Sequence, residues 1–414
     1  MMEDLLYLGS WAYTSDALEF FGMCSCMKGG LVFADEVTTV SPTYSQEIQT
    51  AYYGERLDGL LRSRVDHLTG ILNGIDTAEY DPQNDTAIAA TYGPDTFDKK
   101  VENKLALQRE LGLTVDKDIP MIAMISRLSG QKGLDLVECV LPEIMNTGAQ
   151  LVILGMGESR YVDLFSWAQW KYPNQVSANF QMNHVLAHKI YSAADLFLMP
   201  SLFEPCGLSQ LISLRYGTLP ITRETGGLRD TVLAYNEYTG DGNGFTFLYY
   251  NAHDMLHVIE NAVRMYHEQR DVFNGLAIRA MRGQYGWDQS AKQYVNLYVK
   301  LMGEEAPTPA AEAAPEAPAE AVEAPAEPVV EAPEAEKPEE APAPKKPAAR
   351  KKAALKAEAD EAKAAPKKRA TKAKAEEKPA EKKPTARKKA VKAEAEPAPE
   401  KKPRKKKAEA EEAK

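Results

Sequence analysis

The sequence predicts an α/β fold built on an open, doubly wound parallel sheet. Between residues 119 and 303, short apolar runs of strand length alternate with helical patterns. Two segments, 200–208 and 216–230, each join a buried-strand pattern to a helix and carry glycine beside charged residues at the junction. In an open α/β sheet such junctions lie where the carboxyl ends of the strands meet, which is where ligands bind.

The elements before this sheet are sparse. Region 1–81 has a strand pattern at 36–42, a helix at 43–53 and a strand followed by a turn at 69–76, which is too little for an independent core. We interpret it as the end of a domain. Region 82–118 carries Asp and Pro turn signals and one helix at 97–111 that Gly112 ends, so we interpret it as a connector.

Region 119–302 contains the sheet itself. The expected strands are 121–126, 150–155, 176–180, 195–200, 219–222 and 244–248. The expected helices between them are 133–145, 161–172, 186–193, 208–215 and 228–234. A final helix, 286–302, has Tyr294 and Tyr298 on one face, a spacing that we interpret as core packing.

The segment 303–414 consists almost entirely of Ala, Pro, Glu and Lys and has no aromatic residue. It cannot bury enough apolar surface to offset the entropy of ordering it, so we expect it to be disordered. One hypothesis is that its Lys-rich end binds nucleic acid or another polyanion, with the release of counterions as the driving force. The interspersed Glu residues favour a solvated polyampholyte instead.

Charge and cysteine content restrict the class of protein. The net charge is −10, and because acids and bases nearly balance in the segment 303–414, the foldable part is acidic, which argues against a globular nucleic-acid-binding domain. The 4 cysteines are scattered apart from Cys24 and Cys26, a pattern typical of a reduced compartment, and no second pair completes a metal site. No signal peptide or membrane-spanning run is apparent, so we expect a cytoplasmic protein without membrane contacts.

The first strand-to-helix loops contain the strongest candidates for chemistry. Arg127 and Lys132 lie in a glycine-containing loop after the strand 121–126, and a guanidinium with a nearby ammonium suits a diphosphate. Glu204 is suited to contact a sugar hydroxyl or to stabilise positive charge, although an acid there also complements a helix N-terminus. Cys206 is either a small buried side chain or a reactive thiol that lines the site.

The second junction combines Arg223 and Thr225 with Gly226 and Gly227, where backbone N–H groups are able to face an anion. Asp230 is either a ligand-binding acid or an acid of the first helical turn. We interpret the Gly-Met-Gly segment at 155–157 as a turn, and the histidines, His184 and His188 included, as surface or core residues rather than metal ligands.

Taken together, these segments resemble the bacterial glycogen (starch) synthases, retaining glycosyltransferases that extend α-1,4-glucan from ADP-glucose. The resemblance covers residues 18–302. It rests on Val-Thr-Thr-Val-Ser-Pro-Thr-Tyr at 37–44, Ile-Leu-Asn-Gly-Ile-Asp at 71–76, Ser-Arg-Leu at 126–128, Gln-Lys-Gly-Leu-Asp-Leu at 131–136, Phe-Glu-Pro-Cys-Gly-Leu at 203–208 and Thr-Gly-Gly-Leu at 225–228.

The resemblance implies a GT-B fold, with a complete C-terminal Rossmann-like domain and only the end of the N-terminal one. It also implies that Arg127 and Lys132 hold the donor diphosphate, that Glu204 lies by the transferred glucose, and that Asn73 lines the cleft. The remaining implied contacts to donor or acceptor come from Cys206, Gly207, Leu208, Thr225, Gly226, Gly227 and Leu228. Such enzymes need no bound metal or cofactor, since cationic side chains and helix N-termini neutralise the leaving diphosphate. The implied partners are ADP-glucose and glycogen.

The chain departs from the family in two places. It lacks the Lys-x-Gly-Gly-Leu motif of the family's first βα turn, so we expect a chain truncated at its N-terminus. Met182 replaces an aromatic residue that helps to seat the adenine. The alternative hypothesis is therefore a half-domain that binds nucleotide or glucan without turnover. The absence of an obvious second carboxylate, with Ile212 at the position eight after Glu204 where related glycosyltransferases often have another Glu, fits the implied retaining mechanism.

Overall fold

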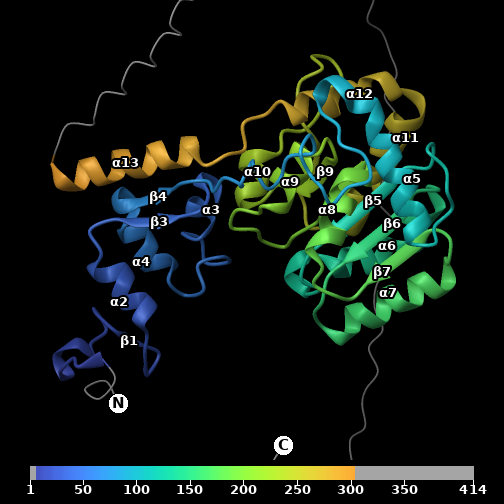
Figure 1. The fold of residues 1–414 in the computed structure, drawn as a ribbon. Helices are drawn as coiled ribbons and strands as arrows, with labels where there is room; N and C mark the ends of the chain where they lie inside the picture. The colour runs from blue at the N-terminus through green and yellow to red at the C-terminus, as the bar shows by residue number, and fades with distance from the viewer. Residues whose placement is uncertain (1–5, 304–414) are drawn as a thin grey trace, which may run out of the picture. The chain divides into compact units, whose positions relative to one another are not determined.

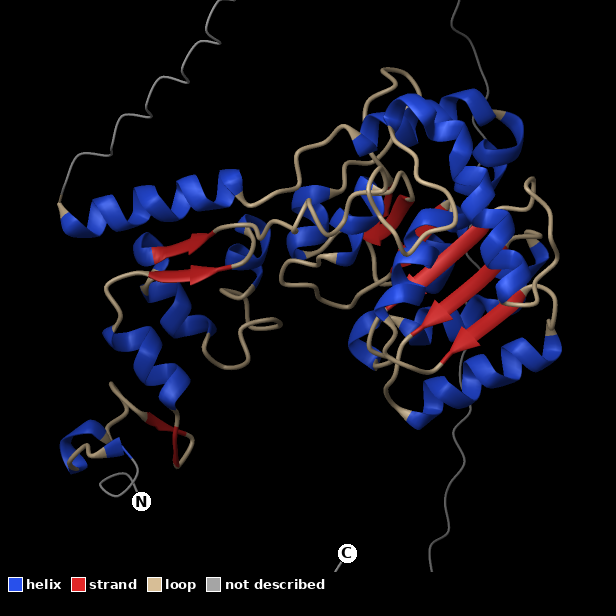
Figure 2. Ribbon diagram, viewed as in Figure 1, coloured by secondary structure: helices blue, strands red, loops and turns tan. Residues whose placement is uncertain are grey.

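The computed structural model describes residues 6–303; residues 1–5 and the segment 304–414, on which the prediction of disorder falls, lie outside the described residues. Its largest element is a six-stranded sheet, whose strands are among the red arrows in Figure 2. The strand order is β10-β9-β8-β5-β6-β7. The strands are β5 (Met121–Ile125), β6 (Gln150–Leu154), β7 (Val176–Asn179), β8 (Leu196–Met199), β9 (Leu219–Arg223) and β10 (Phe245–Phe247). All their pairings are parallel, which confirms the α/β prediction.

The strand order places a topological switch point in the middle of the sheet. The chain runs from β5 outward through β6 to β7 and then returns to β8 on the other side of β5. The loops after β5 and β8 therefore diverge at the same end of two adjacent strands, which opens a crevice for a ligand.

Helices cover both faces of the sheet (Figure 1), and the four inner strands, β9, β8, β5 and β6, are mostly buried on both sides. Alternate residues of β5 join different cores: Ile122 and Met124 pack with one set of helices, whereas Met121 and Ala123 pack with the other. The first set is α6 (Leu134–Asn146), α7 (Ser159–Lys171), α11 (Ala252–Glu268) and α12 (Arg270–Met281). The second is α5 (Lys100–Glu110), α8 (His184–Ala193) and α9 (Ser209–Arg215).

Helices α11 and α12 were not predicted from the sequence. The sequence nevertheless contains a signal for the start of α11, namely Asn251, a residue type that is preferred at the N-cap of helices. In the structure its side chain accepts hydrogen bonds from the backbone N–H groups of His253 and Asp254. Buried residues of α11 then recur at helical spacing, at Met255, Ile259, Ala262 and Tyr266 in particular. The predicted helix 228–234 lies two residues early in the structure, as α10 (Gly226–Thr231).

The N-terminal part contains a two-stranded parallel sheet of β3 (Val37–Thr39) and β4 (Leu68–Gly70). Helix α3 (Pro42–Glu47) follows β3, after Ser41 as N-cap and Pro42 at the first helical position. It is shorter than the predicted helix 43–53. Helices α2 (Cys26–Phe33) and α4 (Asp58–Ser63) and a hairpin of β1 (Glu19–Phe20) with β2 (Met23–Cys24) complete this part.

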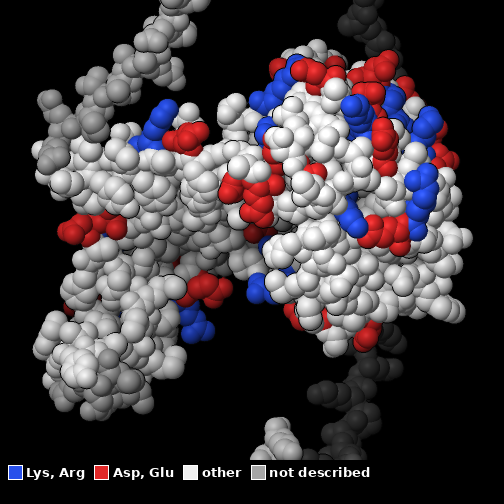
Figure 3. All heavy atoms as spheres, in the orientation of Figure 1, with Lys and Arg blue, Asp and Glu red and all other residues white. Residues whose placement is uncertain are grey.

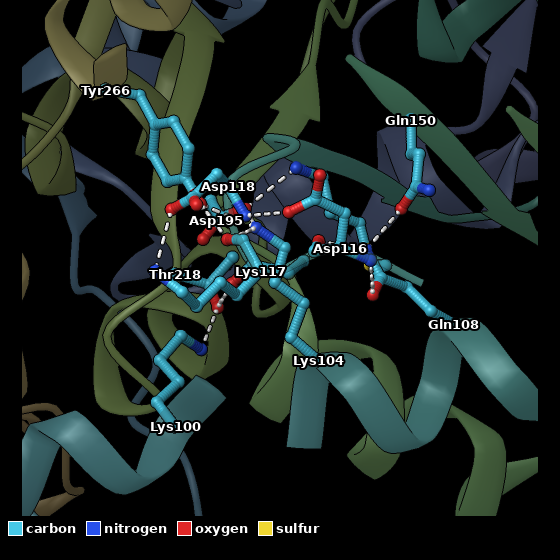
Figure 4. A network of polar contacts seen from close by, with 12 residues as sticks. Lys100, Lys104, Gln108, Asp116, Lys117, Asp118, Gln150, Asp195, Thr218 and Tyr266 are labelled. Atoms are coloured by element: carbon cyan, nitrogen blue, oxygen red, sulfur yellow. Dashed lines mark hydrogen bonds and ion pairs between the residues drawn. The ribbon is translucent and has the colours of Figure 1, made fainter. Parts of the chain in front are cut away.

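Helix α5 anchors the connector to the sheet domain through two buried lysines, shown in Figure 4. Lys100 donates hydrogen bonds to carbonyl oxygens at the ends of α8 and α9. Lys104 forms a buried ion pair with Asp195, with 2.7 Å between Nζ and Oδ2, and that carboxylate also accepts the backbone N–H of Met121. These contacts tie the connector to the start of the sheet.

The final helix, α13 (Asp288–Met302), is formed as predicted, but its interpretation as core packing was wrong. Tyr298 is 57% exposed, and Ser290 is the buried residue of this helix. Helical spacing identifies an apolar face, whereas only a packed neighbour makes that face part of a core. On the face in Figure 3, charged side chains gather over the six-stranded sheet domain and are sparse over the N-terminal part.

Candidate functional site

The site lies at the carboxyl ends of β5 and β8, beside the switch point. Lys132 follows β5 and Glu204 follows β8, and their side chains form an ion pair with 2.7 Å between Nζ and Oε2. The hydroxyl of Ser201 donates to the same Glu204 oxygen over 3.0 Å. Because the Glu204 side chain is only 9% exposed, the carboxylate is held in a fixed orientation by these two donors.

Backbone contacts bring these two loops together. Gly133 has φ +70°, and a Cβ at this position would lie 1.9 Å from the carbonyl oxygen of Pro200. Only glycine fits here, because it needs no space for a side chain and tolerates positive φ. The N–H of Leu202 donates to the carbonyl of Gln131 over 2.9 Å, so the loop that carries Lys132 is joined directly to the loop that carries Glu204.

Arg127 lies at the rim of the site and faces a different feature. Its side chain is exposed and donates to Gln131 Oε1 over 3.2 Å, without contacting Glu204. It lines a cavity of about 640 Å³ at the ends of β5, β6 and β7. The other residues that line this cavity are Ile125, Ser126, Leu154, Gly155, Met156, Gly157, Gln181, Met182, Asn183, His184 and Ala187.

Most of this cavity wall is apolar, and its shape depends on two glycines. A Cβ on Gly155 would lie 1.8 Å from Ser126 O, and one on Gly157 would lie 2.0 Å from Leu128 O. The interpretation of this segment as a turn was wrong, because Gly157 forms a parallel bridge with Leu128 and the backbone continues paired beyond β6; the segment forms part of the cavity. Met182 is 84% exposed at the cavity edge, where a flat ligand is able to pack against its thioether.

Cys206, two residues after Glu204 in the same loop, contacts the backbone of Asn73. Cys206 is 5% exposed, and burial raises the pKa of its thiol although the backbone N–H of Asn73 donates to it. A buried, protonated thiol fits the small-side-chain interpretation rather than the reactive one. Gly207, with φ +73°, and the exposed Leu208 continue the loop to the start of α9.

The second junction differs from the open anion site that the sequence indicated. Thr225, Gly226, Gly227 and Leu228 are all buried. Thr225 Oγ1 and the N–H of Gly226 donate to the carboxylate of Glu47, over 2.9 and 3.0 Å. These polar groups therefore already have an acceptor within the chain. The neighbouring N–H of Gly227 donates to the carbonyl of Glu204, so the segment packs against the Glu204 loop.

Sequence reasoning missed two residues of this region, Ser201 and Glu47. Ser201 had a signal, since it stands three residues before Glu204 in the same loop. Glu47 is distant in sequence from every other member and had none. Arg223, assigned to the second junction, donates from Nε to the carbonyl of Ser201 over 2.8 Å and from its guanidinium to the hydroxyl of Tyr53 over 3.2 Å.

The charges of the site suit an anionic ligand. Lys132 and Arg127 supply positive charge around the crevice, Glu204 supplies one fixed carboxylate, and the apolar cavity begins beside Arg127. Among residues 6–303 there is no cluster of three or more metal-ligating side chains. No helix within these residues has the length and apolarity that a membrane span requires.

Family models match two parts of the chain. Residues 1–63 match the starch synthase catalytic domain, and residues 112–275 match the glycosyl transferases group 1. A glycogen synthase of Geobacillus thermodenitrificans is 56% identical over 305 residues, which cover 74% of this chain and 63% of that relative. A glycogen synthase of Bacillus cereus is 52% identical over 302 residues, 73% of this chain and 63% of the relative.

A solved structure agrees with these relatives. The catalytic domain of starch synthase IV from Arabidopsis thaliana, bound to ADP and acarbose, is 33% identical and superposes with a TM-score of 0.68, over 71% of this chain and 62% of that one. The chain thus spans about 63% of the length of the curated relatives that it matches. On this sequence and structural likeness, the chain belongs to the glycogen and starch synthase family of glycosyltransferases, which have the GT-B fold.

Proposed function

We propose that this protein transfers glucose from ADP-glucose to the non-reducing end of an α-1,4-glucan, with retention of configuration at the anomeric carbon. The observation that carries the proposal is the Lys132–Glu204 pair at the switch point, beside the apolar cavity that Arg127 lines. This arrangement offers a place for each part of a nucleotide sugar: base, diphosphate and hexose. The similarity to glycogen synthases supports glucose as the sugar and glycogen as the acceptor.

In this proposal, Arg127 and Lys132 bind the diphosphate and stabilise the negative charge that develops on it as the glycosidic bond breaks. The guanidinium of Arg127 donates bidentate hydrogen bonds to two phosphate oxygens, whereas the ammonium of Lys132 acts as a point charge. The Lys132 ammonium also orients Glu204, whose second oxygen is left to accept a hydrogen bond from a glucose hydroxyl. Positive charge on the sugar ring in the transition state is then stabilised by the same carboxylate.

The cavity beside Arg127 is proposed to hold the adenine, with Met182 packed against the base. The plant relative of known structure was bound to ADP and acarbose, which supports a nucleotide and a saccharide as the ligand classes. In the other substrate-binding assignments, Cys206, Gly207 and Leu208 line the hexose site, Asn73 faces it across the cleft, and the buried 225–228 segment acts indirectly. We further propose that the chain is organised as the end of an N-terminal domain (1–81), a connector (82–118) and a nucleotide-sugar-binding domain (119–302). The proposed compartment is the cytoplasm.

The test is incorporation of labelled glucose into glycogen by the purified chain, with ADP-glucose and UDP-glucose compared as donors. We expect transfer from ADP-glucose, and a loss of at least about a hundredfold in Arg127→Ala and Lys132→Met. The exposed pair Arg160 and Glu138 offers a matched control, since Arg160→Ala removes an arginine of the same domain outside the site. The configuration of the product is read by its sensitivity to an α-specific glucosidase.

One outcome would favour the alternative function, and another would contradict the assigned role of the ion pair. Tight ADP binding without turnover, at saturating donor and acceptor, would instead favour a nucleotide- and glucan-binding half-domain. Turnover that survives in Lys132→Met would contradict the assigned role of the Lys132–Glu204 pair.

A further inference from the structure

Two short helices that are remote in sequence cap one another in this structure. The carboxylate of Glu47, the last residue of α3, accepts from Thr225 Oγ1 and the N–H of Gly226 at the start of α10. In return, Asp230 near the end of α10 accepts from Ser41 Oγ and from the N–H and hydroxyl of Thr43 at the start of α3. We call this pair of reciprocal contacts the α3–α10 clamp.

The clamp joins the N-terminal part to α10, and α10 in turn contacts the Glu204 loop. The N–H of Gly227, next to the Glu47 contact, donates to the carbonyl of Glu204 over 3.1 Å. A Cβ on Gly226 would lie 2.0 Å from the same carbonyl oxygen, so α10 and the loop are in direct backbone contact. Any shift of the start of α10 must therefore move the backbone of Glu204.

Simple packing does not account for the choice of residues in the clamp. Packing of α3 on α10 would be served by apolar side chains, yet each helix places a carboxylate at the N-terminal end of the other. Glu47 also keeps one buried oxygen, Oε2, without a partner among the described residues. A half-buried carboxylate with one buried oxygen unpaired costs stability, which indicates that Glu47 serves to fix this arrangement.

We propose that Glu47 and Asp230 are positioning residues for the candidate active site, and that the clamp sets the orientation of Glu204 from the N-terminal part of the chain. The contact runs from Glu47 to Gly226, from Gly227 to the Glu204 carbonyl, and along the loop to the carboxylate that Lys132 and Ser201 hold. The catalytic meaning of this device rests on the proposed function, whereas the mechanical coupling does not.

Hydrogen exchange on the full chain tests the coupling without any need for activity. In Glu47→Ala we expect exchange on the order of tenfold faster at the N–H of Gly227 and in residues 201–207, where the N–H of Leu202 is a protected reporter. Glu47→Gln keeps an acceptor for the N–H of Gly226 and should restore most of the protection. Glu138→Ala, which breaks an exposed ion pair with Arg160, is the control and should change neither segment.

Exchange that rises only in residues 41–47 and 225–231, with 201–207 unchanged, would overturn the proposal. If Glu47→Ala unfolds as a whole, Asp230→Ala, which removes the acceptor for Ser41 and Thr43, replaces it as the test variant, with the same expectation for residues 201–207. In glucosyl transfer, we expect kcat to fall by about tenfold in Glu47→Ala while KM for ADP-glucose and the Kd of ADP stay within about twofold, because the groups assigned to the nucleotide are untouched. Equal losses in Glu47→Ala and Glu47→Gln would count against positioning. An inactive wild-type chain would contradict the proposed function and leave the exchange result to decide the coupling.

Discussion

Replacing Lys100 by Met tests the anchor that holds the connector on the sheet domain. The ammonium of Lys100 is fully buried and lies 2.9–3.3 Å from five oxygens, those of Tyr191, Ser192 and Tyr216 carbonyls and of Thr218 and Tyr92 hydroxyls. A methionine of similar length fills the same space without donating a hydrogen bond. The variant therefore removes the polar interactions and leaves little cavity.

The size of the loss follows from which acceptors keep another donor. Tyr216 O still accepts from Tyr92 over 2.7 Å, and Tyr191 O still accepts from Thr218 over 2.6 Å. Ser192 O keeps only a contact of 3.4 Å and becomes nearly unsatisfied. The variant loses charge-assisted hydrogen bonds and leaves one carbonyl without a good donor, but it also avoids the cost of burying a charge. The net loss in unfolding free energy is about 3 kcal/mol.

The pH dependence gives this prediction a second, independent measurement. Burial lowers the pKa of Lys100 to about 7, so between that value and the ordinary lysine pKa the unfolded chain binds more protons than the folded one. Stability contributed by Lys100 therefore rises with pH above 7, by about 2 kcal/mol between pH 7 and pH 9. Below pH 7 that contribution is lost.

Urea unfolding of both proteins at pH 7 and pH 9, followed by circular dichroism, measures these quantities. We expect the gap in unfolding free energy between wild type and Lys100→Met to widen as the pH rises. A Lys100→Met variant that is as stable as wild type, or a gap that narrows with pH, would refute this reasoning.

Three further predictions concern the site. Gly133→Ala should destabilise the protein by more than about 2 kcal/mol in the same unfolding assay, because φ is +70° and the new Cβ would meet Pro200 O; an unchanged midpoint would contradict the assigned backbone contact. Iodoacetamide at pH 8 should label the exposed Cys24, Cys26 and Cys139 well before the buried Cys206, as read by mass spectrometry of the digest; early labelling of Cys206 would show that the loop opens. Met182→Tyr should tighten ADP binding by about threefold to tenfold in calorimetry, because an aromatic ring stacks on a base better than a thioether does, and weaker binding would remove the adenine from this cavity.

The inner strands of the sheet were predictable because each is a short run of mainly apolar residues, buried on both faces. Ile122 and Ala123 point to opposite cores, so both had to be apolar, and that requirement is visible in the sequence. Tyr298 shows the limit of this reasoning, since its spacing is the same whether or not another element covers it.

The sequence by itself determined the α/β class, the six strands and the candidate loops, because these depend on local alternation, on glycine and on residues that stand close together in the chain. Ser201, Glu204 and Lys132 belong to loops whose positions after strands were readable. Only the tertiary structure decided that Glu47 and Asp230 join α3 to α10, and that the groups at Thr225 and Gly226 bind a carboxylate of the same chain. Such pairings lie nearly two hundred residues apart, and no local pattern encodes them, since a carboxylate on a short helix has the same sequence signature whether it faces water or caps another helix.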